Sequence, residues 1–382
     1  MDLSLNEDQR DLRDLVREFL EKEVVPHRAQ WDRDESVDTS IVPRLGELGV
    51  FGFGIPEEYG GVQADFFTYV LVMEELGRAD SAIRGIVSVS NGLVAKTIAA
   101  HGTTEQKQQW LPGLATGRQL GCFGLTEPGN GSDAGNLTTK ARRDGSDYVL
   151  QGEKIFITNG TWADVALVFA RTSDEGPHGV TAFVVPTDAP GLTRTEIKGK
   201  LGLRGQATAS LAFDDVRVPE SAVLGEPGTG FKIAMTALDK GRVGVAAGCV
   251  GIVQACLEAV VEYTGERTQF GKPIAGYQLV QEMIADISLD ADAARLMVWR
   301  AADLIDRGEP FRVAASKAKL FASEAAVRSS NLAIQAFGGY GYVDEYPVQK
   351  LMRDARVMTL YEGTSQIQKL LIGRAETGIN AF

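Results

Sequence analysis

Cysteine and histidine are both scarce in this chain of 382 residues, which contains three of each. Cys122, Cys249 and Cys256 form no CxxC pair and no disulfide pattern, and such usage favours a reducing compartment. The histidines lie far apart in the sequence, and none has a neighbour suited to bind zinc. We therefore expect a cytoplasmic protein without a disulfide framework and without a metal site.

Positive charge is also in deficit, because 39 lysines and arginines stand against 51 aspartates and glutamates, which gives a net charge of −12. An acidic surface argues against binding to nucleic-acid phosphates or to an anionic membrane. No apolar run approaches the roughly 20 residues that a membrane span needs. The polar start MDLSLNEDQR is unlike a signal peptide. The sequence therefore predicts neither a nucleic-acid partner nor a membrane span.

Residues 1–118 have the pattern of a helical domain. The tetrapeptide SLNE at Ser4 to Glu7 fits a capping box, and apolar residues at helical spacing follow it. Further helical runs are expected near residues 41–53, 65–77 and 86–100. The segment IPEEYGG predicts a loop because of its proline and paired glycines.

The pattern changes near Gly121, and residues 119–225 predict a β domain. Runs rich in Val, Ile, Phe and Thr, bounded by turn residues, favour strands. Several strands at short spacing are typical of a compact barrel or sandwich. The runs are GCFGLTEPG, DYVLQGEKIFITNG, ADVALVFART, GVTAFVVPT and ASLAFDDVRVP.

Residues 226–382 return to helical periodicity. Long stretches rich in alanine and poor in helix breakers predict a helical bundle. The glycine-rich segment FGGYGYVDEYP interrupts them, and such a loop inside a bundle needs a reason. The sequence thus predicts an α+β multidomain protein, with a helical domain, a β domain and a second helical domain in that order.

The segment LYEGTSQIQ at residues 360–368 places one carboxylate, Glu362, between an aromatic ring and a Gly-Thr-Ser turn. A catalytic base needs such apolar walls and a bend that aims it, because burial raises the pKa of a carboxyl group. The alternative is an ordinary acid stabilised by the dipole at a helix N-terminus. From these residues alone, that simpler interpretation is favoured.

Five sequence blocks, in this order and at this spacing, resemble the acyl-CoA dehydrogenase family over essentially the whole chain. The resemblance implies an N-terminal helical domain, a middle β domain and a C-terminal four-helix bundle. It also implies one FAD per subunit in a homotetramer or dimer, and an electron-transfer flavoprotein as electron acceptor. The blocks are CFGLTEPGNGSDAGNLTT (122–139), KIFITNG (154–160), KLGLRG (200–205), ERTQFGKPIAGYQ (266–278) and QAFGGYGYVDEYPVQKLMRDARVMTLYEGTSQIQ (335–368).

The resemblance makes Glu362 the catalytic base that removes the α-proton of an acyl-CoA thioester, while the β-hydride passes to flavin N5. Some members carry the base at the position of Gly241 here, and glycine cannot act as a base, so Glu362 has no competitor. The backbone N–H of Glu362 would stabilise the thioester oxygen. Arg242 matches an arginine near the active site, and its alternative role is an ion pair at the edge of the core. The expected substrate contacts are Ser132, Arg84, Asp239, Arg242, Tyr361 and Gly363.

The FAD site implied by the resemblance draws on distant parts of the chain. The TEPGNGSD loop would hold the flavin ring, and Phe156 stands where many members have tryptophan. Arg267 would bind the pyrophosphate of an FAD in a neighbouring subunit, and the glycines after Gln335 would leave room for the cofactor. The expected contacts are Phe123, Leu125, Thr126, Ser132, Phe156, Thr158, Arg267, Gln269, Phe270, Gln335, Gly338, Gly339, Thr364 and Gln366.

The acyl group of the substrate stays open at this point. Short-chain members usually carry a small residue at the position of Arg84, whereas glutaryl-CoA dehydrogenases carry arginine there to hold a distal carboxylate. The alternative for Arg84 is a helix-surface residue paired with an acid such as Asp80. Glutaryl members place an acid seven residues earlier, where this chain has Gly77. That departure disfavours decarboxylation of glutaryl-CoA more than it disfavours dicarboxylyl-CoA binding in general.

Two further functions compete with a short- or medium-chain acyl-CoA dehydrogenase of fatty acid β-oxidation. A flavin oxidase of the same fold is disfavoured by length, because related acyl-CoA oxidases usually carry an additional C-terminal domain. A catalytically inactive relative that serves as a binding protein would have damaged motifs, whereas Glu362, Thr126, Ser132 and Arg267 are all present.

Overall fold

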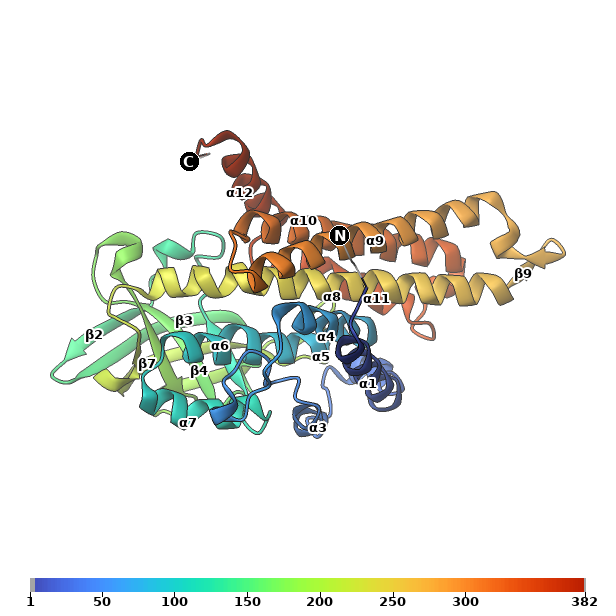
Figure 1. The fold of residues 1–382 in the computed structure, drawn as a ribbon. Coiled ribbons are helices and arrows are strands. Elements are labelled where there is room, and N and C mark those ends of the chain that lie inside the picture. The colour runs from blue at the N-terminus through green and yellow to red at the C-terminus, as the bar shows by residue number, and fades with distance from the viewer. Residues whose placement is uncertain (1–3, 381–382) are drawn as a thin grey trace.

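Helices make up the N-terminal part of the computed structural model, which describes residues 4–380 (Figure 1). A π-helical segment, η2, continues directly from α5 into α6, and its Asn91 donates hydrogen bonds from Nδ2 to the carbonyls of Phe51 and Phe53 at 2.7 and 3.0 Å. The elements are α1 (Glu7–Glu23), α2 (Arg28–Asp34), α3 (Ile41–Glu47), η1 (Glu57–Tyr59), α4 (Phe66–Ala79), α5 (Ser81–Val87), η2 (Ser88–Ala95), α6 (Lys96–His101) and α7 (Thr104–Ala115).

The capping box of the first helix lies two residues beyond the predicted one. Asn6 is the N-cap, and its side chain accepts a hydrogen bond from the N–H of Gln9 at 2.8 Å. The side chain of Gln9 accepts from the N–H of Asn6 at 3.1 Å. The prediction of Ser4 as the N-cap was therefore wrong by two positions. Asparagine is as good an N-cap residue as serine, and Gln9 supplies the second hydrogen bond of the capping box.

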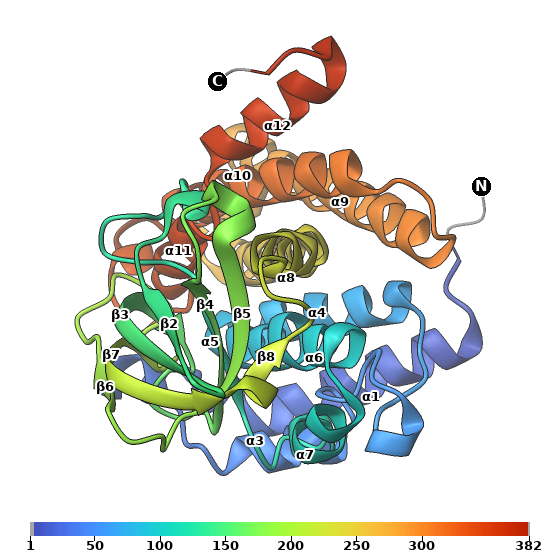
Figure 2. The same cartoon turned by 90° about the vertical axis from the view of Figure 1, so that its left-hand side faces the viewer.

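The middle of the chain forms one eight-stranded sheet, which confirms the predicted β-rich region. The strand order is β6-β7-β3-β2-β4-β5-β8, and β1 pairs with β4 in parallel. Figure 2 shows this sheet beside the helices. The strands are β1 (Gly121–Gly124), β2 (Lys140–Asp144), β3 (Asp147–Thr158), β4 (Val165–Arg171), β5 (Val180–Pro186), β6 (Leu192–Glu196), β7 (Thr208–Pro219) and β8 (Val223–Leu224), with short 3₁₀ turns at Ala134–Asn136, Gly176–Gly179 and Glu220–Ala222.

The C-terminal part is helical, as predicted, and α8 and α10 pack against each other and against both α9 and α11. Figure 2 looks along α8 and shows it between α4 on one side and α9 and α10 on the other. The elements are α8 (Gly230–Glu266), β9 (Thr268–Gln269), β10 (Lys272–Pro273), η6 (Ile274–Gly276), α9 (Gln278–Asp306), α10 (Arg312–Phe337), η7 (Gly338–Tyr342), α11 (Val348–Met358) and α12 (Ser365–Thr377).

The expectation that no apolar run reaches membrane-spanning length was wrong for α8. Within the described residues, this helix alone is long and apolar enough to cross a membrane by length and composition. However, 78% of its most apolar window is buried inside the protein. Its apolar character therefore reflects its place at the centre of the bundle.

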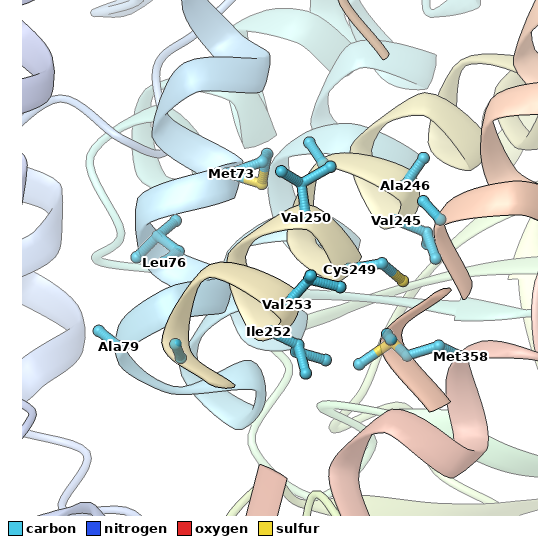
Figure 3. Packing of buried hydrophobic residues seen from close by; sticks show 14 of the residues in the cluster. Met73, Leu76, Ala79, Val245, Ala246, Cys249, Val250, Ile252, Val253 and Met358 are labelled. Carbon is cyan, nitrogen blue, oxygen red and sulfur yellow. The ribbon is translucent and has the colours of Figure 1, made fainter. Parts of the chain in front are cut away.

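Glycines on one face of α8 allow neighbouring segments to approach very closely. A Cβ built on Gly251 would lie 2.1 Å from the carbonyl oxygen of Glu74 in α4, and a Cβ on Gly77 would lie 2.4 Å from the carbonyl oxygen of Gly248. Gly77 therefore has a packing reason, because any side chain there would push α4 away from α8. Figure 3 shows the apolar core around this contact, with Met73, Leu76 and Ala79 of α4 and Met358 near Val245, Ala246, Cys249, Val250, Ile252 and Val253 of α8.

We predict that Gly251→Ala destabilises the fold, because its Cβ would overlap backbone atoms of α4 that cannot move independently. Overpacking of this kind costs about 1–3 kcal/mol in the free energy of unfolding. Gly265→Ala on the same helix is the matched control, because nothing lies within 4 Å of its Cβ position. Chemical denaturation of both variants checks the prediction, and equal stability of the two would contradict it.

Candidate active site

Glu362 lies in the short loop between α11 and α12, in a backbone conformation that side chains rarely adopt. Its φ angle is 49°, and Gly363 follows with φ 90°. The left-handed region is sterically costly for a residue with a Cβ, and such strain persists where the surrounding structure imposes it, often at functional sites. The loop is therefore held in a specific shape around this carboxylate.

The carboxylate of Glu362 lies against Gly241, the position at which some family members carry their base. A Cβ built on Gly241 would lie 2.4 Å from Oε2 of Glu362 and 3.0 Å from Cδ2 of Leu93. Oε2 is shielded from solvent and accepts no hydrogen bond from any described residue. Gly241 thus makes the space that the carboxylate occupies.

The pKa of Glu362 reflects two opposing influences. Burial raises the pKa of this carboxyl group above its ordinary value, because the charged form loses its hydration. The cations Arg84, Lys319 and Arg242 partly offset this rise. A raised pKa suits a base that must accept a proton from a weakly acidic carbon.

The two peptide groups around Glu362 have different hydrogen-bond environments. The carbonyl of Glu362 accepts a hydrogen bond from Nε2 of Gln368 at 3.2 Å. Within the part of the chain that the structure describes, the N–H of Glu362 donates to no acceptor. This free donor, beside the carboxylate, fits the expected role toward a thioester oxygen.

Arg84 is buried beside the loop, with only 1% of its surface exposed. Its Nη2 donates to the hydroxyl of Tyr361, and its guanidinium lies 5.9 Å from the centre of that ring. Asp80 pairs with Lys350 at 2.9 Å instead. The interpretation of Arg84 as a surface residue paired with Asp80 was therefore wrong. The Nε of Arg84 has no hydrogen-bond partner among residues 4–380.

Asp239 and Arg242 form a charged cluster on α8 next to the loop. Arg242 donates from Nη1 to Asp239 at 2.6 Å, and Nε of Arg312 lies 2.7 Å from the other carboxylate oxygen. Arg242 Nε also reaches the carbonyl of Glu362 at 3.5 Å. The ion pair expected as the alternative role of Arg242 is present, and it holds the arginine beside Glu362.

The expected flavin contacts of the β domain lie near the ends of β1 and β3. The ring of Phe156 is 65% exposed on a left-handed backbone with φ 59°. Thr158 accepts a hydrogen bond from Gln206 at 3.0 Å. Thr126 is half-buried and Ser132 is exposed, whereas the side chains of Phe123 and Leu125 are buried, so only their backbone groups are available to a ligand.

The sequence analysis missed the ion pair that fixes the TEPGNGSD loop. Lys154 Nζ lies 2.8 Å from Glu127 Oε1, and both side chains are buried. Glu127 also accepts from the N–H groups of Thr138 and Thr139 at 2.6 and 2.8 Å. Burial alone would raise the pKa of Glu127, but Lys154 and these hydrogen bonds together lower it to about 2. The lone lysine in the apolar strand KIFITNG was the sequence feature from which such a pair could have been predicted.

The remaining expected cofactor contacts fall into two groups. Thr364 caps α12, accepting from the N–H of Ile367 at 3.3 Å, and Gln366 is exposed one turn from Glu362. The second group lies at the far end of the bundle near β9, away from the sheet (Figure 1). There the guanidinium of Arg267 lies 5.4 Å from the ring of Tyr340. This group comprises Arg267, Gln269, Phe270, Gln335, Gly338 and Gly339.

Comparison with known proteins shows the family of the chain. Family descriptions of the acyl-CoA dehydrogenase N-terminal, middle and C-terminal domains match residues 6–118, 122–216 and 228–377. The chain belongs to the acyl-CoA dehydrogenase family. Members of this family are FAD-dependent oxidoreductases that act on CH–CH groups.

Three relatives illustrate the similarity. The mitochondrial short-chain specific acyl-CoA dehydrogenase of Mus musculus is 46% identical over 97% of this chain and 90% of its own length. Butyryl-CoA dehydrogenase from Megasphaera elsdenii superimposes with a TM-score of 0.96 at 42% identity, covering 98% of this chain and all of that one. Glutaryl-CoA dehydrogenase from Mycobacterium smegmatis gives a TM-score of 0.95 at 40% identity, covering 99% of this chain and 96% of that one.

We predict that Gly241→Ala lowers kcat/KM without unfolding the protein, because the new methyl group would displace the carboxylate of Glu362. A displacement of about 1 Å at a reacting group can cost about 100-fold in rate. Steady-state kinetics of the FAD-loaded variant check this, with Gly265→Ala as control. Wild-type kcat/KM in Gly241→Ala would show that the carboxylate need not occupy this space.

Proposed function

We propose that this protein is an FAD-dependent acyl-CoA dehydrogenase that converts short-chain acyl-CoA thioesters to trans-2-enoyl-CoA. The observation that carries the proposal is the carboxylate of Glu362, whose Oε2 is shielded from solvent and has no hydrogen-bond partner among the described residues, on a left-handed backbone against Gly241. A carboxylate that served only stability would be expected to have a partner, because burying a charge without one is costly.

The chain's own groups account for the proton transfer. Glu362 takes the proton from the α-carbon, and its raised pKa brings it closer to the acidity of that carbon. The free N–H of Glu362 is placed to donate to the thioester oxygen, on which negative charge develops as the proton leaves. FAD, when bound, supplies the acceptor for the β-hydride. The residues that would hold it fit this role, since Phe156 offers an exposed ring and Gly129, Gly131, Gly338 and Gly339 face open space.

The names of the relatives favour a short acyl chain, because the similar proteins from Mus musculus and Megasphaera elsdenii are short-chain and butyryl-CoA dehydrogenases. One observation supports a second candidate, a dehydrogenase of dicarboxylyl-CoA thioesters. Arg84 is a buried cation with no carboxylate within ion-pair distance among residues 4–380, and its Nε is unpaired. A terminal carboxylate would neutralise it.

We further propose that the protein works as a homo-oligomer, a homotetramer by family resemblance. Arg267 and the glycines of η7 lie far from Glu362, so they would reach FAD only in another subunit. Large apolar side chains near the same end and along α9 are exposed, which supports a buried interface. They include Phe270 (94%), Tyr342 (86%), Leu279 (71%) and Leu289 (70%). An electron-transfer flavoprotein as acceptor, a cytoplasmic location and a place in fatty acid β-oxidation complete the proposal.

The substrate is tested by anaerobic titration of the FAD-loaded protein with butyryl-, octanoyl-, isobutyryl-, glutaryl- and adipyl-CoA, following the visible flavin band. We predict bleaching by butyryl-CoA at the lowest concentration. Bleaching by the dicarboxylyl thioesters alone would overturn the short-chain assignment and make Arg84 the specificity residue. In that case Arg84→Met would abolish the response to glutaryl-CoA.

The base is tested by Glu362→Gln, which keeps the size of the side chain but cannot accept the proton. We predict that the variant retains FAD and binds thioesters but is not bleached by them. In the wild type, kcat/KM should fall as the pH decreases through the raised pKa of Glu362, because only the carboxylate is active. The midpoint of this fall, the acidic limb of the pH profile, should therefore lie above the ordinary glutamate pKa of about 4.3. Full bleaching of Glu362→Gln would show that another group is the base.

A further inference from the structure

Lys319 of α10 is a fully buried cation that donates its hydrogen bond to the loop of the base. None of its side chain is exposed, and Nζ donates to the carbonyl oxygen of Gly363 at 2.8 Å. Within the described residues, no carboxylate lies within ion-pair distance of Lys319. The buried charge is thus directed at a backbone carbonyl next to Glu362.

This arrangement is costly and therefore calls for a reason. Burial lowers the pKa of Lys319 to about 8, with Cys249 and Glu362 acting in the opposite direction. A buried ammonium without a counterion loses hydration that one hydrogen bond only partly replaces. A charge-assisted hydrogen bond is nevertheless stronger than a neutral one, so the carbonyl of Gly363 is held firmly.

Gln368 of α12 provides a second donor to the same loop. Its Nε2 donates to the carbonyls of Glu362 at 3.2 Å and of Gly363 at 3.1 Å, and none of its side chain is exposed. Gln368 also approaches Gly363 so closely that a Cβ there would lie 2.6 Å from Nε2. Two buried side chains from different helices thus converge on the two consecutive carbonyls that begin at Glu362.

We propose that Lys319 and Gln368 are positioning residues for α-proton removal. Together they hold the carbonyls of Glu362 and Gly363 so that Glu362 keeps its left-handed backbone and its carboxylate stays against Gly241. Without these two donors, the carbonyl of Glu362 keeps only the 3.5 Å contact with Nε of Arg242. The two peptide groups can then rotate and Glu362 can relax toward an unstrained φ, which moves the carboxylate away from its place. The proposal rests on Glu362 as the base.

The test compares Lys319→Met and Gln368→Met, which remove the donors while keeping a side chain of similar length. The control is Lys317→Met, the same substitution two residues away on α10, where the lysine pairs with exposed Glu376. In FAD-loaded protein we expect kcat to fall about 10- to 100-fold in both test variants, with KM little changed. Lys317→Met should behave like the wild type.

The pH profile separates positioning from general damage to the fold. Lys319→Met removes a cation that lowers the pKa of Glu362, so its acidic limb should move to higher pH. Gln368→Met removes no charge, so its limb should move less than that of Lys319→Met. Wild-type kcat in either folded variant, or limb shifts of equal size in both, would overturn the proposal. If Lys319→Met does not fold, kcat of Gln368→Met decides alone.

Glu362→Gln, measured in the same assay, distinguishes this proposal from the proposed base. If Glu362→Gln is active, the base assignment itself fails. If it is inactive while the two test variants turn over at the wild-type rate, the base assignment stands and only the positioning role fails.

Discussion

The glycine-bearing face of α8 is the constraint on which the active site depends. Gly241, Gly244, Gly248 and Gly251 recur at intervals of three or four residues, so they share one side of the helix. Glycine inside a helix costs about 0.5–1 kcal/mol relative to alanine, so four of them on one face require a compensating gain. Each one lets a different group approach the helix axis.

The groups that approach these glycines lie one after another along the same face of α8. Glu362 lies on Gly241, the hydroxyl of Tyr69 lies 3.0 Å from the Cβ position of Gly244, and Cδ of Arg84 lies 2.6 Å from that of Gly248. Gly251 admits the backbone of α4. Glu362, which projects from the α11–α12 loop, the buried Arg84 and the N-terminal domain thus all contact the same face of one long helix.

The buried cations differ in whether a carboxylate lies within ion-pair distance of them. Lys350 lies 2.9 Å from Asp80 and 2.6 Å from Asp354. Asp80 caps α5, and Asp354 accepts from the N–H of Leu203, so this cluster joins all three parts of the chain. Arg84 and Lys319 are buried as deeply, but within residues 4–380 neither has a carboxylate at ion-pair distance, and both lie beside the Glu362 loop. The Lys350 cluster therefore joins the domains, whereas the loop of Glu362 is contacted by two unpaired cations and by Arg242, which is paired with Asp239.

The order of the three domains could be predicted from the sequence, because helical and strand periodicity are local signals. Glu362 was singled out by the family resemblance, since its neighbouring residues alone favoured an ordinary acid at a helix N-terminus, and its catalytic role stays a prediction. Strands β2 and β6 were missed because KARRD and LTRTE are polar and mostly exposed, without the apolar alternation that marks a strand. The burial of Arg84 was not predictable, because a glycine 164 positions away makes its space. Lys319 and Gln368 carried no signal, since the carbonyls that they hold become neighbours only in the fold.

Arg84 is a buried cation that lies beside the loop of Glu362, and its contacts bear on which acyl groups the proposed reaction would accept. Nη2 of Arg84 donates a hydrogen bond to the hydroxyl of Tyr361 and lies 3.9 Å from the sulfur of Met358. The guanidinium therefore already has polar contacts within the protein. Its charge is also the largest of the influences that lower the pKa of Glu362. The positive charge of Arg84 therefore limits how far burial raises the pKa of Glu362, with or without a substrate carboxylate. A short alkyl chain that leaves the Arg84–Tyr361 contact in place would preserve this role, whereas a carboxylate tail would compete with Tyr361 for the same donors and shift the balance of charge at Glu362.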